Sequence, residues 1–255
     1  MERIIEYFYA SHVGKCRRVN QDNFFCDGQM LMDKSQGTDG VCFGKISVKK
    51  NPVFCVFDGM GGEECGEIAS FLAAESVEKQ DFDRGMEQVF REYCLQTNRR
   101  ICEKTGELGI RSMGTTAAML RITDGESGLC NVGDSKIFLL ADGVFSQLSF
   151  DHVGIAAFGK KPPLLQNLGI PEEEMRIDPY IAAGSLREGD TYLLCSDGLT
   201  DMVSNARIQQ ILEENRGQQA AQLLLDEALK NGGKDNITFI LLYITKKRFL
   251  RGIKL

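Results

Sequence analysis

The feature that most constrains this fold is a series of short apolar runs, several of which end or begin at an aspartate. Apolar runs of this length, bounded by turn-forming residues, are typical of buried β-strands. The clearest runs are Pro52–Phe57, Thr115–Ile122, Gly128–Val132, Lys136–Leu140, Thr191–Cys195 and Ile237–Ile244. Between such runs, Asp124-Gly125 and Asp142-Gly143 predict hairpin turns, which join antiparallel strands. The middle of the chain is therefore predicted to be rich in antiparallel strands.

Helical periodicity lies on both sides of this strand-rich region. Two helices are predicted before it, over Glu63–Gln80 and Arg84–Lys104. A short helix capped at Ser204-Asn205 follows it, and a further helix ends at Asn231–Gly233. Helices that flank antiparallel sheets predict an α+β fold.

Composition and length predict one globular domain over residues 1–245 and a basic tail over 246–255. Within the domain, the Pro- and Gly-containing segment Lys160–Pro171 predicts an exposed insertion, which we place at about 158–180. Neither a signal peptide nor an apolar run long enough to span a bilayer is recognisable. We therefore expect a cytoplasmic protein, monomeric and without a membrane span.

The charge and the cysteines exclude some classes of function. The net charge of −6 argues against a nucleic-acid partner. Nine cysteines are present, an odd number, and no pair has the CxxC spacing of a zinc or redox site. We expect reduced and mostly buried thiols.

Aspartates at strand ends are the candidate chemical groups. Asp58 and Asp197 each follow an apolar run, Asp235 precedes one, and Asp134 separates two. Each alone is also the pattern of an ordinary tight turn. Together they predict a carboxylate cluster, which cations must neutralise because the charges repel. With only two histidines and no cysteine cluster, oxygen ligands favour Mg²⁺ or Mn²⁺ over zinc.

A basic segment precedes a further aspartate near the start of the chain. In the sequence GKCRRVNQD, Arg17 lies five residues before Asp22. An arginine can bind a phosphate dianion with its planar fork of donors, so it complements a metal-directed carboxylate. The alternative is a basic run on the surface.

Taken in order, these motifs resemble the bacterial form of the protein phosphatase type 2C family, the metal-dependent Ser/Thr phosphatases. The resemblance extends from about residue 7 to residue 243, and the ordered set of motifs carries it. The matching segments are Gly14–Asp22, Asp58–Gly62, Gly114–Thr116, Gly133–Ser135, Asp151-His152, Ser196–Leu199 and Asp235-Asn236.

The resemblance implies a four-layer αββα sandwich, with two antiparallel β-sheets flanked by helix pairs, and a binuclear metal centre. Asp58 would bridge two Mn²⁺ or Mg²⁺ ions, and the carbonyl of Gly59 would bind the second. Asp197 and Asp235 would complete the first site, and Asp22 would act through bound water. A third ion would use Asp134 with Asp197.

The resemblance also implies the reaction, in which a water or hydroxide bridging the metals attacks the phosphomonoester directly. Arg17 would hold the phosphate. Substrates would be phosphorylated proteins, products of a Ser/Thr protein kinase, and the segment at 158–180 would form a flap. Three alternatives remain: a pseudophosphatase that serves as a scaffold, a phosphatase dedicated to one signalling regulator, and an unrelated metallohydrolase.

Some positions depart from the family pattern. Met60 stands where eukaryotic members have a histidine proposed as general acid, although methionine is usual in bacterial members. Lys136 stands where arginine is commoner. The sequence after Asp151-His152 matches the usual flap poorly. For His152 and His12 we expect structural roles, in preference to catalysis.

Overall fold

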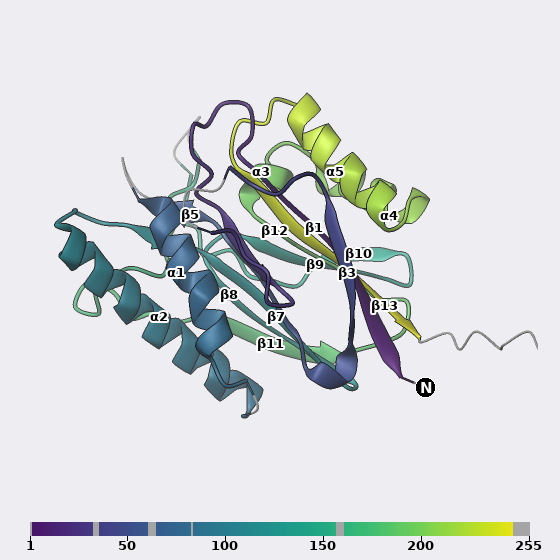
Figure 1. Cartoon of the computed structure of the whole chain (residues 1–255), viewed down its shortest axis with the longest axis horizontal. Helices are drawn as coiled ribbons and strands as arrows, with labels where there is room; N and C mark the ends of the chain where they lie inside the picture. The colour runs from purple at the N-terminus through teal and green to yellow at the C-terminus, as the bar shows by residue number, and fades with distance from the viewer. Residues whose placement is uncertain (1, 33–35, 61–64, 83, 157–160, 247–255) are drawn as a thin grey trace, which may run out of the picture.

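The computed structural model describes residues 2–32, 36–60, 65–82, 84–156 and 161–246. In these ranges, two antiparallel sheets pack face to face, and helices cover the outer side of each (Figure 1). The glycines at 61–62, the start of the predicted insertion at 158–160 and the basic tail at 247–255 lie outside the described residues.

The larger sheet has six strands in the order β10-β9-β12-β13-β1-β3. Its strands are β1 (Arg3–His12), β3 (Cys42–Ser47), β9 (Lys136–Ala141), β10 (Val144–Gln147), β12 (Thr191–Cys195) and β13 (Ile237–Lys246). The first and last strands in the chain, β1 and β13, pair along their whole length, from Arg3 with Lys246 to His12 with Ile237. This pairing brings segments from both ends of the sequence to one place.

The second sheet has five strands in the order β11-β8-β7-β4-β2. Its strands are β2 (Asn23–Cys26), β4 (Val53–Phe57), β7 (Ala117–Thr123), β8 (Glu126–Val132) and β11 (Tyr180–Ser185). A two-stranded ribbon, β5 (Gly59–Met60) with β6 (Gly114–Thr115), follows the end of β4. Both predicted hairpins are confirmed, with Asp124-Gly125 between β7 and β8 and Asp142-Gly143 between β9 and β10.

Helices cover both outer faces. They are α1 (Gly66–Lys79), α2 (Met86–Leu108), α3 (Asp197–Thr200), α4 (Asn205–Glu214) and α5 (Gln218–Lys230), with a 3₁₀ turn, η1, at Val48–Lys50. The pair α1 and α2 packs on the five-stranded sheet, whereas α4 and α5 pack on the six-stranded sheet. The predicted cap of α4 is confirmed, because the Ser204 hydroxyl accepts a hydrogen bond from the Arg207 backbone NH at 3.3 Å.

Successive side chains of a strand point to opposite faces of its sheet, and this creates three apolar cores. In β4, Phe54 and Val56 belong to the core between the sheets, whereas Cys55 and Phe57 belong to the core under α1 and α2. The third core lies between the six-stranded sheet and α3, α4 and α5. The predicted four-layer αββα sandwich is thus confirmed, and burial on both faces explains why these strands are almost continuously apolar.

Three local predictions are wrong. The run Thr115–Ile122 is two strands, because the chain leaves β6 and enters β7 at Thr116. The tight turn that the sequence pattern at Asp197 also suggested is instead the short helix α3. The predicted insertion is not exposed at its centre, where Leu168 is fully buried and pairs with Thr115 of β6.

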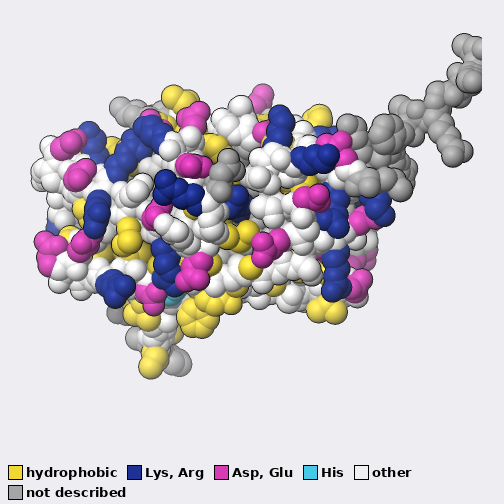
Figure 2. All heavy atoms as spheres, turned by 90° about the horizontal axis from the view of Figure 1, so that it is seen from below, with side chains coloured by type: hydrophobic (Ala, Val, Ile, Leu, Met, Phe, Trp, Pro, Cys, Tyr) yellow, Lys and Arg dark blue, Asp and Glu magenta, His cyan; other side chains and the backbone are white. Residues whose placement is uncertain are grey.

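Acidic and basic side chains are intermingled over the face of the molecule seen in Figure 2. None of the helices in the described ranges has the length and apolar character needed to cross a membrane.

Candidate functional site

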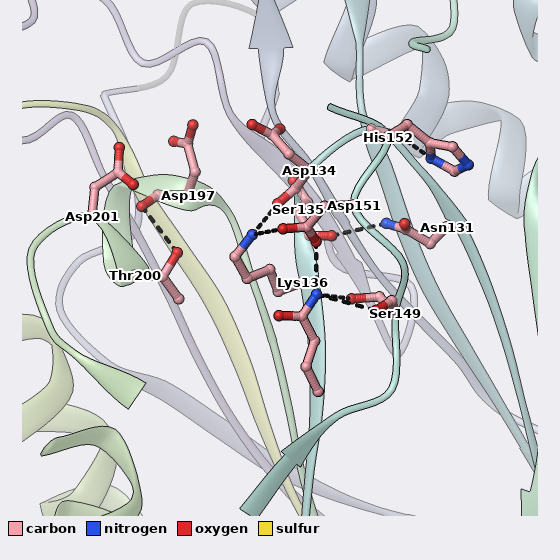
Figure 3. Close-up of polar contacts among 12 residues, drawn as sticks. Asn131, Asp134, Ser135, Lys136, Ser149, Asp151, His152, Asp197, Thr200 and Asp201 are labelled. Atoms are coloured by element: carbon pink, nitrogen blue, oxygen red, sulfur yellow. Dashed lines mark hydrogen bonds and ion pairs between the residues drawn. The ribbon is translucent and has the colours of Figure 1, made fainter. Parts of the chain in front are cut away.

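The aspartates at the strand ends line one cavity, with a volume of about 790 Å³. Asp58 follows β4 of the five-stranded sheet, whereas Asp197 and Asp235 adjoin β12 and β13 of the six-stranded sheet. Asp134, in the loop between β8 and β9, also lines it, and Figure 3 shows its carboxylate pointing to the same side as that of Asp197. The cavity therefore joins the two sheets at one end of the sandwich.

The backbone at Asp58 is held firmly. Its NH donates to the Thr116 hydroxyl at 2.9 Å, and its carbonyl accepts from the Thr115 hydroxyl at 3.0 Å. The Gly59 NH donates to the Gln21 carbonyl at 3.1 Å. A Cβ on Gly59 would lie 2.2 Å from that same oxygen, so only glycine allows the chain to approach so closely.

Asn236 joins the loops that carry the other acidic groups. Its side-chain amide donates to the carbonyls of Val13 and Val19 at 2.9 and 3.0 Å, and its side-chain oxygen accepts from the Gln21 NH at 2.8 Å. A Cβ on Gly198 would lie 1.8 Å from the Asn236 carbonyl oxygen. The loop before β13 is thus fixed against both the Arg17–Asp22 segment and the start of α3.

Asp22 lies behind the cavity wall and is almost fully buried. Its carboxylate accepts a hydrogen bond from the Ser196 hydroxyl at 2.7 Å. Burial raises the pKa of Asp22 to about 7, although hydrogen bonds from Ser196 and Thr238 lower it. Asp22 is not among the residues that line the cavity.

Two basic side chains pair with the acidic groups. Arg17 donates to the Asp235 carboxylate at 2.8 Å, and both side chains are partly exposed. Lys161 contacts Asp197 and also lies 3.3 Å from the Asp201 carboxylate. Burial lowers the pKa of Lys161, but these carboxylates outweigh it and the pKa is raised.

Negative charge is concentrated at Asp58. Its pKa is raised well above the usual range, first by burial and then by Asp22, Asp197, Asp134 and Asp235. Burial and Asp197 likewise raise the pKa of Asp134. Such raised pKa values are expected where carboxylates lie close together without enough positive charge nearby to balance them.

The carboxylate oxygens of these aspartates are the kind of ligand that hard divalent cations prefer, but they do not lie close enough together to hold one. Over the described ranges, no three acidic, histidine or cysteine side chains surround a point closely enough to hold a metal as they stand. Arg17 and Lys161 instead pair with Asp235 and Asp197. Metal binding at these carboxylates would require both basic side chains to be displaced.

A family model described as Protein phosphatase 2C matches residues 42–230. The chain belongs to the protein phosphatase 2C family. It is 30% identical over 223 residues to the serine/threonine phosphatase stp of Listeria innocua, covering 75% of this chain and 84% of that protein. It is also 30% identical to PstP of Mycobacterium tuberculosis, covering 93% of this chain and 44% of the longer PstP.

A solved phosphatase 2C structure supports the fold. The catalytic domain of PstP, in complex with two manganese ions, superposes with a TM-score of 0.75 at 26% identity, covering 96% of this chain and all of that domain. The family predicted from the ordered motifs is therefore confirmed.

Other polar residues of this phosphatase 2C chain have structural contacts. His152 Nδ1 accepts from the Gly133 NH at 3.1 Å, and burial lowers the pKa of the ring. This bond ties the His152 ring to the loop before β9. Lys136 pairs with Asp151 and also donates to the backbone carbonyl of Asp134 at 3.1 Å (Figure 3).

Sequence reasoning missed Lys161 and Arg111 as cavity residues. Lys161 lies in the predicted insertion, and Arg111 follows α2, but neither belongs to a recognisable motif. Their positions depend on how the 161–175 segment and the end of α2 pack beside the β5–β6 ribbon.

Proposed function

We propose that this protein hydrolyses phosphoserine and phosphothreonine in proteins, using Mn²⁺ or Mg²⁺ bound by the strand-end aspartates. The observation that carries this proposal is the meeting of Asp58, Asp197 and Asp235 with Arg17 in one cavity, from segments far apart in sequence. The relatives are named serine/threonine phosphatases, and the PstP domain is in complex with manganese, which supports the same chemistry here.

We propose the following metal ligands, all of which line the cavity. Asp58, from the five-stranded sheet, would hold two ions, with the Gly59 carbonyl as a further oxygen ligand. Asp197 and Asp235, from the six-stranded sheet, would complete the first site, and Asp134 with Asp197 would hold a third ion. Bound there, the ions would lower the pKa of water and offset charge on the phosphoryl group.

The chain's own residues bind and orient the substrate. Arg17 is partly exposed at the cavity, so its guanidinium can exchange the Asp235 carboxylate for a phosphate dianion. Asp22, which is almost fully buried, would act on the ions through bound water. Met60 lines the cavity without any group that could donate a proton.

Finer features of the proposal concern the cellular setting. We propose that the substrates are products of a Ser/Thr protein kinase and that the protein works as a monomer in the cytoplasm. The described cysteines are all free thiols, which suits a reducing compartment. The scaffold alternative is less favoured because each proposed acidic ligand is present.

The test is turnover of a phosphothreonine peptide by the purified protein with and without Mn²⁺. We expect phosphate release with Mn²⁺ or Mg²⁺ and its loss in excess EDTA, restored by added metal. Undiminished turnover after thorough chelation would contradict the metal site, and no turnover with any divalent ion would favour the scaffold.

A further inference from the structure

The cavity continues beyond the aspartates, past the β5–β6 ribbon to the end of α2. Met60 of β5 pairs with Gly114 of β6, and Ser112 and Arg111 come just before that strand. At about 790 Å³ the cavity has the size of a site for a molecule much larger than phosphate. The part near Arg111 is therefore available to residues that flank the phosphorylated one.

The outer wall of the cavity is the segment that contains Gly169 and Ile170, and hydrogen bonds hold this segment in place. The Asn98 side chain of α2 accepts from the NH of Gly169 at 2.7 Å and donates to the carbonyl of Ile170 at 2.8 Å. Leu168 forms paired backbone bonds of 2.9 Å with Thr115. A Cβ on Gly114 would lie 2.7 Å from the Leu168 carbonyl oxygen, so wall and ribbon are in direct contact. The wall is thus a fixed surface beside the ribbon.

Arg111 differs from the other basic residues of the cavity. Arg17 pairs with Asp235, and Lys161 pairs with Asp197. Within the described ranges, the Arg111 side chain is exposed and has no ion pair or side-chain hydrogen bond. The backbone around it is nevertheless fixed, because the Ile110 NH donates to the Thr105 carbonyl and Met113 is buried.

We propose that Arg111 recognises a carboxylate side chain of the phosphoprotein, near the phosphorylated residue in sequence; this rests on the phosphatase function proposed above. An unpaired guanidinium at the cavity rim is suited to a carboxylate. Glu174 lines the cavity from the anchored segment and would repel a carboxylate brought close to it. The preference should therefore apply to only one side of the phosphorylated residue.

The experiment compares phosphothreonine peptides that carry Glu, Gln or Lys near the phosphorylated residue, one series before it and one after it. For one series, we expect the wild-type kcat/KM to be about threefold to fivefold higher with Glu than with Gln, as for a partly exposed charge pair. The preference should shrink at high salt. Arg111→Gln should bring the ratio close to one, and Arg111→Glu should favour the Lys peptide.

The matched control is Arg176→Gln, which removes an exposed arginine that does not line the cavity and should retain the wild-type preference. Thermal unfolding confirms that each variant is folded. A wild-type ratio near one in both series, or the same ratio in Arg111→Gln, would overturn the inference while leaving the phosphatase function intact. Failure of the wild type to hydrolyse any peptide with Mn²⁺ would overturn both.

Discussion

At the scale of single residues, the energetic balance at Asp58 governs the site. A buried carboxylate surrounded by other carboxylates is unfavourable unless a cation or a proton neutralises it. The raised pKa of Asp58 expresses that cost in the metal-free protein. The same residue that would bind the ions most tightly is therefore a source of instability without them.

This balance predicts opposite effects of Asp58→Asn on activity and on stability. Turnover should fall by several orders of magnitude because the carboxylate proposed to bridge the ions is lost. In EDTA, the free energy of unfolding at neutral pH should be unchanged or higher, because a buried negative charge has been removed. Phosphate release and chemical denaturation measure the two effects. A near-normal kcat in this variant would exclude the bridging role.

Arg17 should contribute mainly to substrate binding. Arg17→Ala is expected to raise KM with a smaller fall in kcat, and Arg17→Lys should rescue only part of the loss, since lysine lacks the planar fork. Arg18→Ala is the matched control, because Arg18 is exposed next in the chain and does not line the cavity. An unchanged kcat/KM for Arg17→Ala would remove Arg17 from the site.

At the scale of elements, the segment between β10 and β11 has two parts. Its second part is anchored, with Leu168 fully buried against β6. In its first part, the Gly154 NH donates to the Pro163 carbonyl at 2.8 Å, and the Leu165 NH donates to the His152 carbonyl at 2.7 Å. These bonds join residues 152–154 to residues 163–165, so the chain between them can be shortened without touching the anchor.

Replacing residues 155–160 by a short glycine linker, which keeps Lys161 and its pairing with Asp197, tests the role of this loop in recognising protein substrates. We expect kcat/KM to fall more for phosphopeptides than for p-nitrophenyl phosphate, because loops on a rigid scaffold usually carry specificity. The small substrate serves as the internal control for the metal site. Equal losses on both substrates, in a variant that unfolds at the wild-type temperature, would identify an ordinary surface loop.

The same elements show what the sequence could predict. The bounds of β12 were predicted without error, because burial on both faces makes Thr191–Cys195 apolar throughout. By contrast, β11 was not predicted, since its residues are largely exposed or half-buried and give no apolar run. The aspartates were found because strand ends are visible in sequence. Lys161 and Arg111 were not, because only tertiary packing brings them to the cavity.

At the scale of the whole molecule, the proposed site joins the two sheets. Asp58 extends from one sheet, and Asp197 and Asp235 from the other. Bound ions would thus link the two sheets and add to the stability that the apolar core between them provides. Any ligand that binds only the folded state stabilises it by mass action.

Mn²⁺ should therefore raise the temperature of thermal unfolding, independently of any substrate. At a concentration of about 100 times Kd, the expected gain is about 2.7 kcal/mol, which corresponds to roughly 5–10 °C for a domain of this size. Because Lys161 pairs with Asp197, Lys161→Ala should reach the same shift at a lower Mn²⁺ concentration.

The controls separate binding at this site from general effects of the ion. Asp58→Asn should lose most of the shift, and Lys45→Ala, which removes an exposed lysine paired with Glu6 away from the cavity, should keep the wild-type Mn²⁺ dependence. Isothermal titration calorimetry gives the affinities directly. If Asp58→Asn showed the full shift, the ions would bind elsewhere; if Lys161→Ala bound Mn²⁺ no more tightly than the wild type, Lys161 would not compete with the metal.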